Sequence, residues 1–463
     1  MQNLITASEA WIQKLTTVLT CSLAIAIISL SLWGSASHPQ PQTRFDLLQT
    51  DLLLQSAPAP LWSYLPFPTE DLYQQALDSY TRILPQLPAQ DMDKLRLNLG
   101  ILQAKMGKTQ DAIATWQGIQ LRNSQIWLVG QILSGLWANP PQILPTAERQ
   151  LSDTLSGWYL QEALHQLYRV QYRDDRLQAL AQQQQQSAQT ALMKLLWVNF
   201  VPIVGGLVGV LSWLILAMRW LWCKPTTLPQ PRWSVDWTAW QAWGAISFWF
   251  ISFLSISQLL LPWLIKIFHL ARPSENDYFG KSLWVLIPYL LSVLPPLLWI
   301  IWRFRPRWLW SSPWSWRAIA WGIGGYITAI PVVLSFSILS QIILGGKGGG
   351  NPLLPILVDS PDPTAKWILW FTVGICAPIC EELLFRGFLL PSLSSYLPLW
   401  GAICLSGVSF ALVHLNLADL LPLSLLGCCL GYVYWRSQNL WAAILFHSLW
   451  NTGSFLALTA LAS

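Results

Sequence analysis

Two adjacent glutamates interrupt an apolar segment near the carboxyl end of the sequence. From residue 240 onward, Glu381 and Glu382 are the only acidic residues that lie inside such a segment. A carboxylate at the centre of a bilayer costs about 3 kcal/mol on insertion scales, so acids in that position usually serve a function. Arg386 follows Glu382 by four residues, the spacing at which a guanidinium and a carboxylate meet on one helix face. Glu381 is left as the carboxylate without a nearby counter-charge.

Two histidines lie in later apolar segments and could work with these glutamates. Phe410 precedes His414 by four residues and Asn451 follows His447 by four, so each pair shares a helix face. We expect the Phe410 ring to form an aromatic wall beside His414. Polar side chains inside membrane segments usually face the interior of the helix bundle. The two histidines and Asn451 are therefore predicted to converge with the glutamates on one site.

The segments that carry these residues belong to a membrane protein. The chain has 463 residues, of which 53% are hydrophobic and 11% are charged, whereas soluble domains average about 25% charged residues. A helix needs roughly 20 apolar residues to cross a bilayer, and about nine stretches approach that length. They cover residues 15–33, 192–222, 237–268, 283–302, 318–344, 367–390, 397–414, 420–435 and 440–461. The predicted fold is an all-α polytopic membrane helix bundle with an inserted soluble helical domain.

The sequence divides into four parts. Residues 1–37 are predicted to form an N-terminal membrane anchor, because their apolar run is long for a cleaved signal peptide. Residues 38–190 are polar, with leucine and alanine at helical spacing, and predict a soluble α-helical domain. Residues 191–345 hold the membrane helices that precede the core, and residues 346–463 hold the membrane core with the candidate site.

The soluble domain contains a pattern that resembles tetratricopeptide repeats. Leu99, Gly100, Gly107, Ala112 and Trp116 stand at the offsets where such helix pairs place their packing residues. The rest of the domain does not follow the pattern clearly, so repeat-like hairpins and a generic helical bundle both stay open. Either one is more typical of a docking surface for a protein partner than of a catalytic unit.

Charge and cysteine content exclude other classes of function. The net charge of +5 comes partly from basic residues such as Arg303, Arg305 and Arg317, which flank membrane segments and do not form a nucleic-acid patch. If these face the cytoplasm, the soluble domain is extracytoplasmic. The seven cysteines lie in or beside apolar segments and predict no disulfide framework. Cys376 and Cys380 stand four apart, but ordinary packing in a buried helix is favoured over a metal pair.

The three polar clusters resemble the motifs of a known family. Glu381 to Arg386 has the form EExxxR, Phe410 to His414 the form FxxxH, and His447 to Asn451 the form HxxxN. Their order and helical context are similar to those of the CPBP family of CAAX prenyl proteases and bacteriocin-processing enzymes, also called Abi proteins. The resemblance covers residues from about 364 to 456, within the predicted catalytic core, and leaves the first 190 residues outside it.

The resemblance implies an intramembrane endopeptidase that hydrolyses a peptide bond with water as the nucleophile. Glu381 would be the base and His414 would hold the water. His447 and Asn451 would donate hydrogen bonds to the tetrahedral intermediate. Glu382, Arg386 and Phe410 would support the site.

Several features are left open by the resemblance. Family members are often described as metalloproteases, and Glu381, His414 and His447 could ligate zinc; a metal-free glutamate mechanism is favoured here. The substrate would be a membrane-associated protein or peptide, with or without a prenyl group. The alternative function is a non-catalytic membrane scaffold or immunity-type protein that recruits partners through its soluble domain, its polar cluster only holding helices together.

Overall fold

The chain folds into two compact helical units. The computed structural model describes residues 2–36, 42–64, 69–86, 89–121, 124–222, 233, 235–269, 271–274, 276–306, 313–345, 348, 356–357 and 360–462. No strand occurs among them, which confirms the all-α fold. One unit consists of Met1–Gln40 and Phe200–Ser463, and the other of Pro41–Asn199. The predicted boundaries at residues 37/38 and 345/346 involve positions outside the described residues.

The first unit is an integral, multi-pass membrane bundle. Within the described residues, eight helices are long and apolar enough to cross a membrane, and they cover Gln13–Ala36, Asp174–Arg219, Ala239–Ile267, Tyr278–Phe304, Trp316–Leu344, Pro363–Ser394, Leu417–Ser437 and Leu440–Leu461. The ninth predicted span, 397–414, corresponds to α18 (Leu399–Leu412), which has only 14 residues. At about 1.5 Å per residue, α18 is shorter than a bilayer core of about 30 Å.

The short helix α18 ends because the chain turns sharply after it. Leu415 has a φ of 57°, a left-handed conformation that interrupts a right-handed helix. Asn416 then caps α19 (Leu417–Ser437) by accepting a hydrogen bond from the backbone N–H of Ala418. His414 therefore lies in the α18–α19 turn, just after the end of α18, whereas the predicted span 397–414 had His414 as its last residue.

The span that carries both glutamates is a helix with two widened turns. It consists of α15 (Pro363–Phe371), a π-helical turn (Thr372–Cys376), α16 (Ala377–Leu384), a second π-helical turn (Phe385–Leu389) and α17 (Leu390–Ser394). Pro378 and Pro391 stand at the second position after the two π-helical turns. A proline lacks the N–H that would bond to the carbonyl four residues earlier and its ring clashes with that carbonyl, so the helix widens there. The two glutamates lie between these widened turns.

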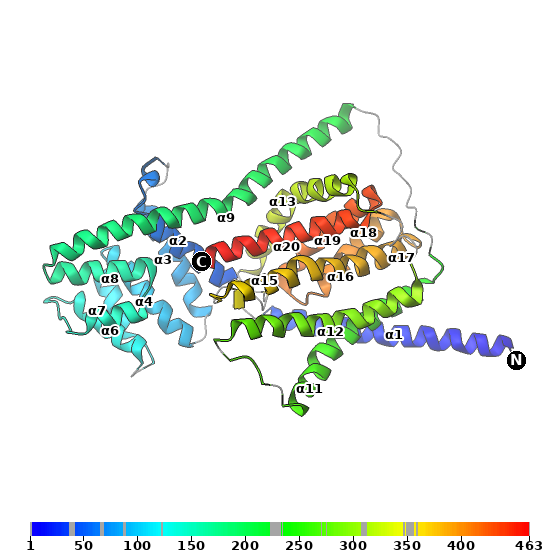
Figure 1. Cartoon of the computed structure of the whole chain (residues 1–463), viewed down its shortest axis with the longest axis horizontal. Coiled ribbons are helices and arrows are strands. Elements are labelled where there is room, and N and C mark those ends of the chain that lie inside the picture. The colour runs from blue at the N-terminus through cyan, green and yellow to red at the C-terminus, as the bar shows by residue number, and fades with distance from the viewer. Residues whose placement is uncertain are drawn as a thin grey trace. The chain divides into compact units, whose positions relative to one another are not determined.

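Small residues allow the helices around the site to approach closely. A Cβ on Gly427 of α19 would lie 2.6 Å from the Cα of Gly407 on α18. A Cβ on Gly325 of α13 (Trp316–Leu344) would lie 2.6 Å from Val433 of α19. Glycines at such crossings are typical of membrane helix packing. Figure 1 shows α13, α19 and α20 (Leu440–Ala462) running beside one another, with α16 and α18 next to them.

Four further helices and the carboxyl half of a fifth complete the membrane unit. α1 (Gln2–Ser35) packs on α10 (Ala239–Ser255), where the Cys21 sulfur lies 3.1 Å from the Ser247 hydroxyl. α10 continues through a π-helical turn (Ile256–Leu260) into α11 (Leu261–Ile267). α12 (Tyr278–Phe304) packs against α10, α15 and α16. The carboxyl half of α9 (Asp174–Trp222) contacts α13, since the Trp213 indole donates to the Thr328 carbonyl at 2.9 Å.

The second unit is a bundle of shorter helices. They are α2 (Gln42–Ser56), α3 (Thr69–Ile83), α4 (Ala89–Lys105), α5 (Thr109–Gln117), α6 (Gln125–Leu136), α7 (Ala147–Thr154), α8 (Gly157–Val170) and the start of α9, with short 3₁₀ turns at Pro60–Tyr64 and Leu84–Gln86. α4 and α5 form a hairpin in which the Trp116 indole lies against Gly100 and donates to the Leu97 carbonyl at 3.1 Å. Gly107, with a φ of 78°, makes the turn between them. Whether this hairpin belongs to a repeat array stays a prediction.

A buried acid lies in the core of this second unit. The Asp51 carboxyl on α2 accepts hydrogen bonds from the hydroxyls of Tyr80 on α3 and Tyr159 on α8, the latter at 2.8 Å. The two hydroxyls are themselves 2.6 Å apart. Burial raises the pKa of Asp51 to about 6, although the two tyrosine hydrogen bonds act in the opposite direction. The carboxyl of Asp51 therefore gains its charge closer to neutrality than an ordinary aspartate does.

Candidate active site

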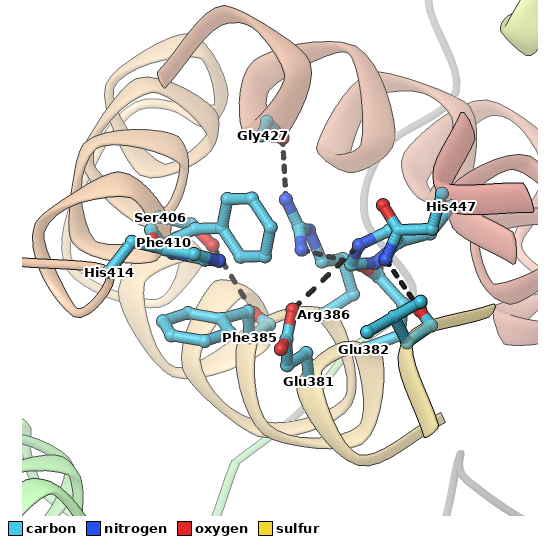
Figure 2. A network of polar contacts seen from close by, with 11 residues as sticks. Glu381, Glu382, Phe385, Arg386, Ser406, Phe410, His414, Gly427 and His447 are labelled. Carbon is cyan, nitrogen blue, oxygen red and sulfur yellow. Dashed lines mark hydrogen bonds and ion pairs between the residues drawn. The ribbon is translucent and has the colours of Figure 1, made fainter. Parts of the chain in front are cut away.

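The site is built around an ion pair that is completely buried. The Arg386 Nη1 atom donates to Glu382 Oε1 at 2.7 Å, and both side chains are completely buried. Arg386 Nη2 donates to the Gly427 carbonyl at 2.9 Å, which ties the glutamate-bearing span to α19. Figure 2 shows this network from close by. The helical pairing expected from the four-residue spacing is present, and it is reinforced by a backbone acceptor that the spacing did not indicate.

Phe410 lies at the centre of this arrangement. The Arg386 guanidinium carbon is 4.7 Å from the centre of the Phe410 ring. The ring centres of His414 and His447 lie 4.9 Å and 5.5 Å from it, both edge to face. Phe410 is therefore more than a wall beside His414. It separates the two histidines and covers the guanidinium with its face, an arrangement that favours the cation.

His447 lies between the two glutamates. Its Nδ1 atom is 2.9 Å from Glu382 Oε1, and its Nε2 atom is 3.8 Å from Glu381 Oε2. Since Glu382 is ion-paired with Arg386 and accepts hydrogen bonds, the proton of a neutral His447 ring belongs on Nδ1. Its Nε2 atom then presents a lone pair toward Glu381. Only a doubly protonated ring would donate from Nε2.

His414 is oriented by the end of its own helix. Its Nδ1 atom is 2.8 Å from the Phe410 carbonyl oxygen. A carbonyl can only accept, so Nδ1 carries the proton and Nε2 of the neutral ring is an acceptor. His414 is exposed, in contrast to His447. Its Nε2 atom is therefore available to a water molecule or a substrate.

Asn451 supports the first π-helical turn. Its Nδ2 atom donates to the Val373 carbonyl at 2.8 Å, across from α20 to the glutamate-bearing span. In a similar way, the Ser406 hydroxyl donates to the Phe385 carbonyl at 3.2 Å at the second π-helical turn. Side chains from two neighbouring helices thus bond to carbonyls of both widened turns. One amide hydrogen of Asn451 is used in this way and the other is left for a further acceptor.

The two adjacent glutamates have different access to the outside. The side chain of Glu382 is completely buried, whereas that of Glu381 is 19% exposed. They point in different directions because successive residues of a helix are about 100° apart. Glu381 is thus the carboxylate that water and a substrate can reach.

Among the described residues, no group of three histidine, cysteine, aspartate or glutamate side chains is arranged to hold a metal ion. Glu381, His414 and His447 are all described, and they do not converge as a ligand set. Nor do Cys376 and Cys380, which are free thiols. Whether the site uses zinc stays a prediction.

Sequence reasoning missed the backbone parts of the site. The carbonyls of Gly427 and Val373 bind Arg386 and Asn451, and neither was a candidate. For Val373 the available signal was Pro378, because a proline leaves a carbonyl about one turn earlier without its helical N–H donor. No such signal marks the Gly427 carbonyl. A proline does not indicate which side chain binds the carbonyl.

Comparisons with known proteins point to the same part of the chain. The family profile described as "Type II CAAX prenyl endopeptidase Rce1-like" matches residues 363–453, a range that contains all seven candidate residues. The protein named "Putative membrane peptidase YdiL" of Bacillus subtilis (strain 168) is 25% identical over 222 residues, 44% of this chain and 86% of the relative. The "UPF0177 protein YxdF" of Lactococcus lactis subsp. lactis (strain IL1403) is 30% identical over 138 residues, 29% of this chain and 74% of the relative. No solved structure matches the chain.

Proposed function

Since the chain belongs to the CPBP family of CAAX-protease-like membrane peptidases, we propose that it hydrolyses a peptide bond of a membrane-associated protein or peptide with a water activated by Glu381. The observation that carries this proposal is the contrast between the two adjacent carboxylates. Glu382 is sealed in an ion pair, while Glu381 is partly exposed beside the lone pair of His447 Nε2. One glutamate is held in place and the other is free to react.

In the proposed reaction, Glu381 takes a proton from the water as the water oxygen attacks the scissile carbonyl carbon. The exposed His414 accepts a hydrogen bond from the same water through Nε2 and holds it in position. When the carbon–nitrogen bond breaks, Glu381 returns its proton to the leaving nitrogen. The products are a carboxylic acid and an amine.

Asn451 and His447 stabilise the tetrahedral intermediate in this proposal. Asn451 retains one amide hydrogen after its bond to Val373, and His447 donates from Nε2 when its ring holds two protons. Glu382 and Arg386 fix the helix and the His447 ring without touching the substrate. Their complete burial supports this positioning role.

We propose that the reaction needs no metal ion, which is supported by the absence of a three-ligand set among the described side chains. Glutamate, histidine and amide groups supply the base and the hydrogen bonds that the chemistry requires. The test is cleavage in the presence of a strong zinc chelator.

The soluble unit, which we propose to be extracytoplasmic, would bring a protein substrate or partner to the membrane. α2 and α3 line a half-open pocket of about 260 Å³, whose polar side chains include Asp46, Gln49, Ser79 and Arg82. Such a mixed-charge pocket is compatible with a peptide segment that carries both charges.

The experiment that tests the function is a comparison of protein termini in membranes of cells producing the wild-type chain or Glu381→Gln. The substitution keeps the size of the side chain and removes the base. New termini that require Glu381 should disappear in the variant while its abundance stays normal. Asp362→Asn is a matched control, because Asp362 caps α15 and asparagine caps equally well. Identical termini with wild-type and Glu381→Gln would refute hydrolysis and favour a scaffold.

A further inference from the structure

Tyr289 on α12 has a buried hydroxyl without a hydrogen-bond partner among the described residues. Its ring is only half-buried, so the polar tip points inward and the apolar body outward. An unpaired buried hydroxyl costs roughly 1–3 kcal/mol. Such groups in a folded protein call for an explanation, and a catalytic role is one of the recognised ones.

Few other buried polar atoms in the described part of the membrane unit lack a hydrogen-bond partner. Within the described part of that unit, they are Glu382 Oε2 and Arg386 Nε, which belong to the ion pair, and Trp249 Nε1. The Trp249 ring stacks on Phe253 at 5.7 Å, within the packing of α10. Tyr289 therefore stands out as an unpaired donor that is neither part of the ion pair nor part of an aromatic stack.

The hydroxyl of Tyr289 lies in the field of the proposed base. α12 packs against α16, which carries Glu381. Glu381, Cys380 and Cys376 are the titratable side chains close enough to act electrostatically on this hydroxyl. The two groups are not hydrogen-bonded to each other. The phenol proton is thus near the reacting carboxylate but not used by it.

The site described above is short of donors that are always available. Neutral His447 presents an acceptor at Nε2, His414 does the same, and Asn451 has already given one hydrogen to Val373. A developing oxyanion needs donors aimed at it, and each one removed typically lowers the rate by 10²–10³-fold, roughly, in other enzymes. A phenol supplies a donor in every protonation state of the histidines.

We propose that Tyr289 is a catalytic residue whose hydroxyl donates a hydrogen bond to the scissile carbonyl oxygen as that oxygen becomes an oxyanion. This inference rests on the proposed peptidase function. The water oxygen bonds to the carbonyl carbon, Glu381 takes the water proton, and the carbonyl π electrons move to the oxygen that faces Tyr289. On collapse, the carbon–nitrogen bond breaks and Glu381 protonates the nitrogen. Tyr289 keeps its proton throughout, so water is the only co-reactant.

The test is Tyr289→Phe in the full-length chain, which removes one oxygen atom. We expect the Glu381-dependent protein termini in cells to form about 100-fold more slowly. A synthetic peptide spanning the mapped cleavage site should show a reduced kcat with little change in KM. Abundance and thermal midpoint in detergent should be equal to wild type or higher, because an unpaired buried hydroxyl is lost. Tyr434→Phe is the control, a buried phenol on α19 whose ring stacks on Trp233, and it should cleave at the wild-type rate.

Three results would overturn the inference. Cleavage at the wild-type rate in Tyr289→Phe would show that the hydroxyl does no chemistry. A slower rate with an equal loss of abundance or thermal stability would assign it a structural role, as would an equal effect of Tyr434→Phe. Failure of the proposed function looks different, since the wild-type chain and Glu381→Gln would then give the same termini and the inference would fall with it.

Discussion

Replacing Asp51 with asparagine should change how the stability of the soluble unit depends on pH. The substitution keeps an oxygen that accepts from Tyr80 and Tyr159 but removes the group that titrates. Burial raises the pKa of Asp51 from 3.8 to about 6. Between these values the folded unit binds the proton more tightly than the unfolded chain does, so the contribution of Asp51 to stability is fully present at low pH and falls as the pH rises.

The size of this effect follows from the two pKa values. A shift of about 2 units corresponds to about 3 kcal/mol, at 1.36 kcal/mol per unit. Most of it is lost between about pH 4 and pH 6, and about 1.4 kcal/mol of it is lost between pH 5 and pH 8. The asparagine variant has no such loss. Between pH 5 and pH 8, the ratio of the folding equilibrium constant of the variant to that of wild type should therefore rise about tenfold.

Hydrogen exchange followed by mass spectrometry on the full-length chain measures this locally. Peptides from α3 and α8 are compared between wild type and Asp51→Asn at pH 5 and at pH 8, so that intrinsic exchange rates cancel at each pH. The ratio of the amide exchange rate in wild type to that in the variant should be about tenfold higher at pH 8 than at pH 5. Asp153→Asn, an exposed acid in the same unit, should show a constant ratio. A constant or falling ratio for Asp51→Asn would refute the reasoning.

Further predictions concern the membrane unit. Arg386→Met should lower the stability by about 3–5 kcal/mol, because Glu382 stays buried without its guanidinium and the Gly427 carbonyl loses its donor; thermal unfolding in detergent measures this, and an unchanged midpoint would contradict it. The chelator 1,10-phenanthroline should leave cleavage of the mapped peptide unaffected, whereas inhibition reversed by added zinc would disprove a metal-free mechanism. Gly209→Leu should separate α9 from α13, because even a Cβ would lie 2.7 Å from Pro331; loss of a disulfide cross-link between cysteines introduced on the two helices reports this, and a retained cross-link speaks against it.

Parts of the site could be predicted from residue spacing alone. The four-residue spacing of Glu382 and Arg386 predicts their contact, since helix geometry brings such residues together regardless of tertiary structure. The same holds for Phe410 and His414, whose rings lie 4.9 Å apart. Hydropathy predicted the all-α membrane unit for a comparable reason, because a bilayer demands long apolar helices.

Other parts depend on local backbone geometry that spacing does not reveal. The segment 397–414 is mostly apolar and was predicted as one span, yet α18 stops after 14 residues because Leu415 adopts a left-handed conformation. A leucine at that position carries no sequence signal for a turn. The contact of His447 with Glu382 joins residues 65 positions apart and requires the packing of α20 against α16. Such contacts follow from tertiary structure only.

The adjacent pair of glutamates shows why residue spacing and tertiary structure are both needed to tell the two carboxylates apart. Chemically the residues are identical, and the sequence separates them only by the arginine four positions after Glu382. The structure adds that Arg386 and His447 both bind the same Glu382 oxygen and that the Glu382 side chain is completely buried, so water reaches Glu381 and not Glu382. Glu381 faces the Nε2 lone pair of His447 at 3.8 Å, a distance that is too long for a direct hydrogen bond. A proton on Glu381 or on His447 Nε2 would allow a hydrogen bond between the two groups. When Glu381 takes the proton of the water, this hydrogen bond would bring Glu381 and His447 closer together around the intermediate.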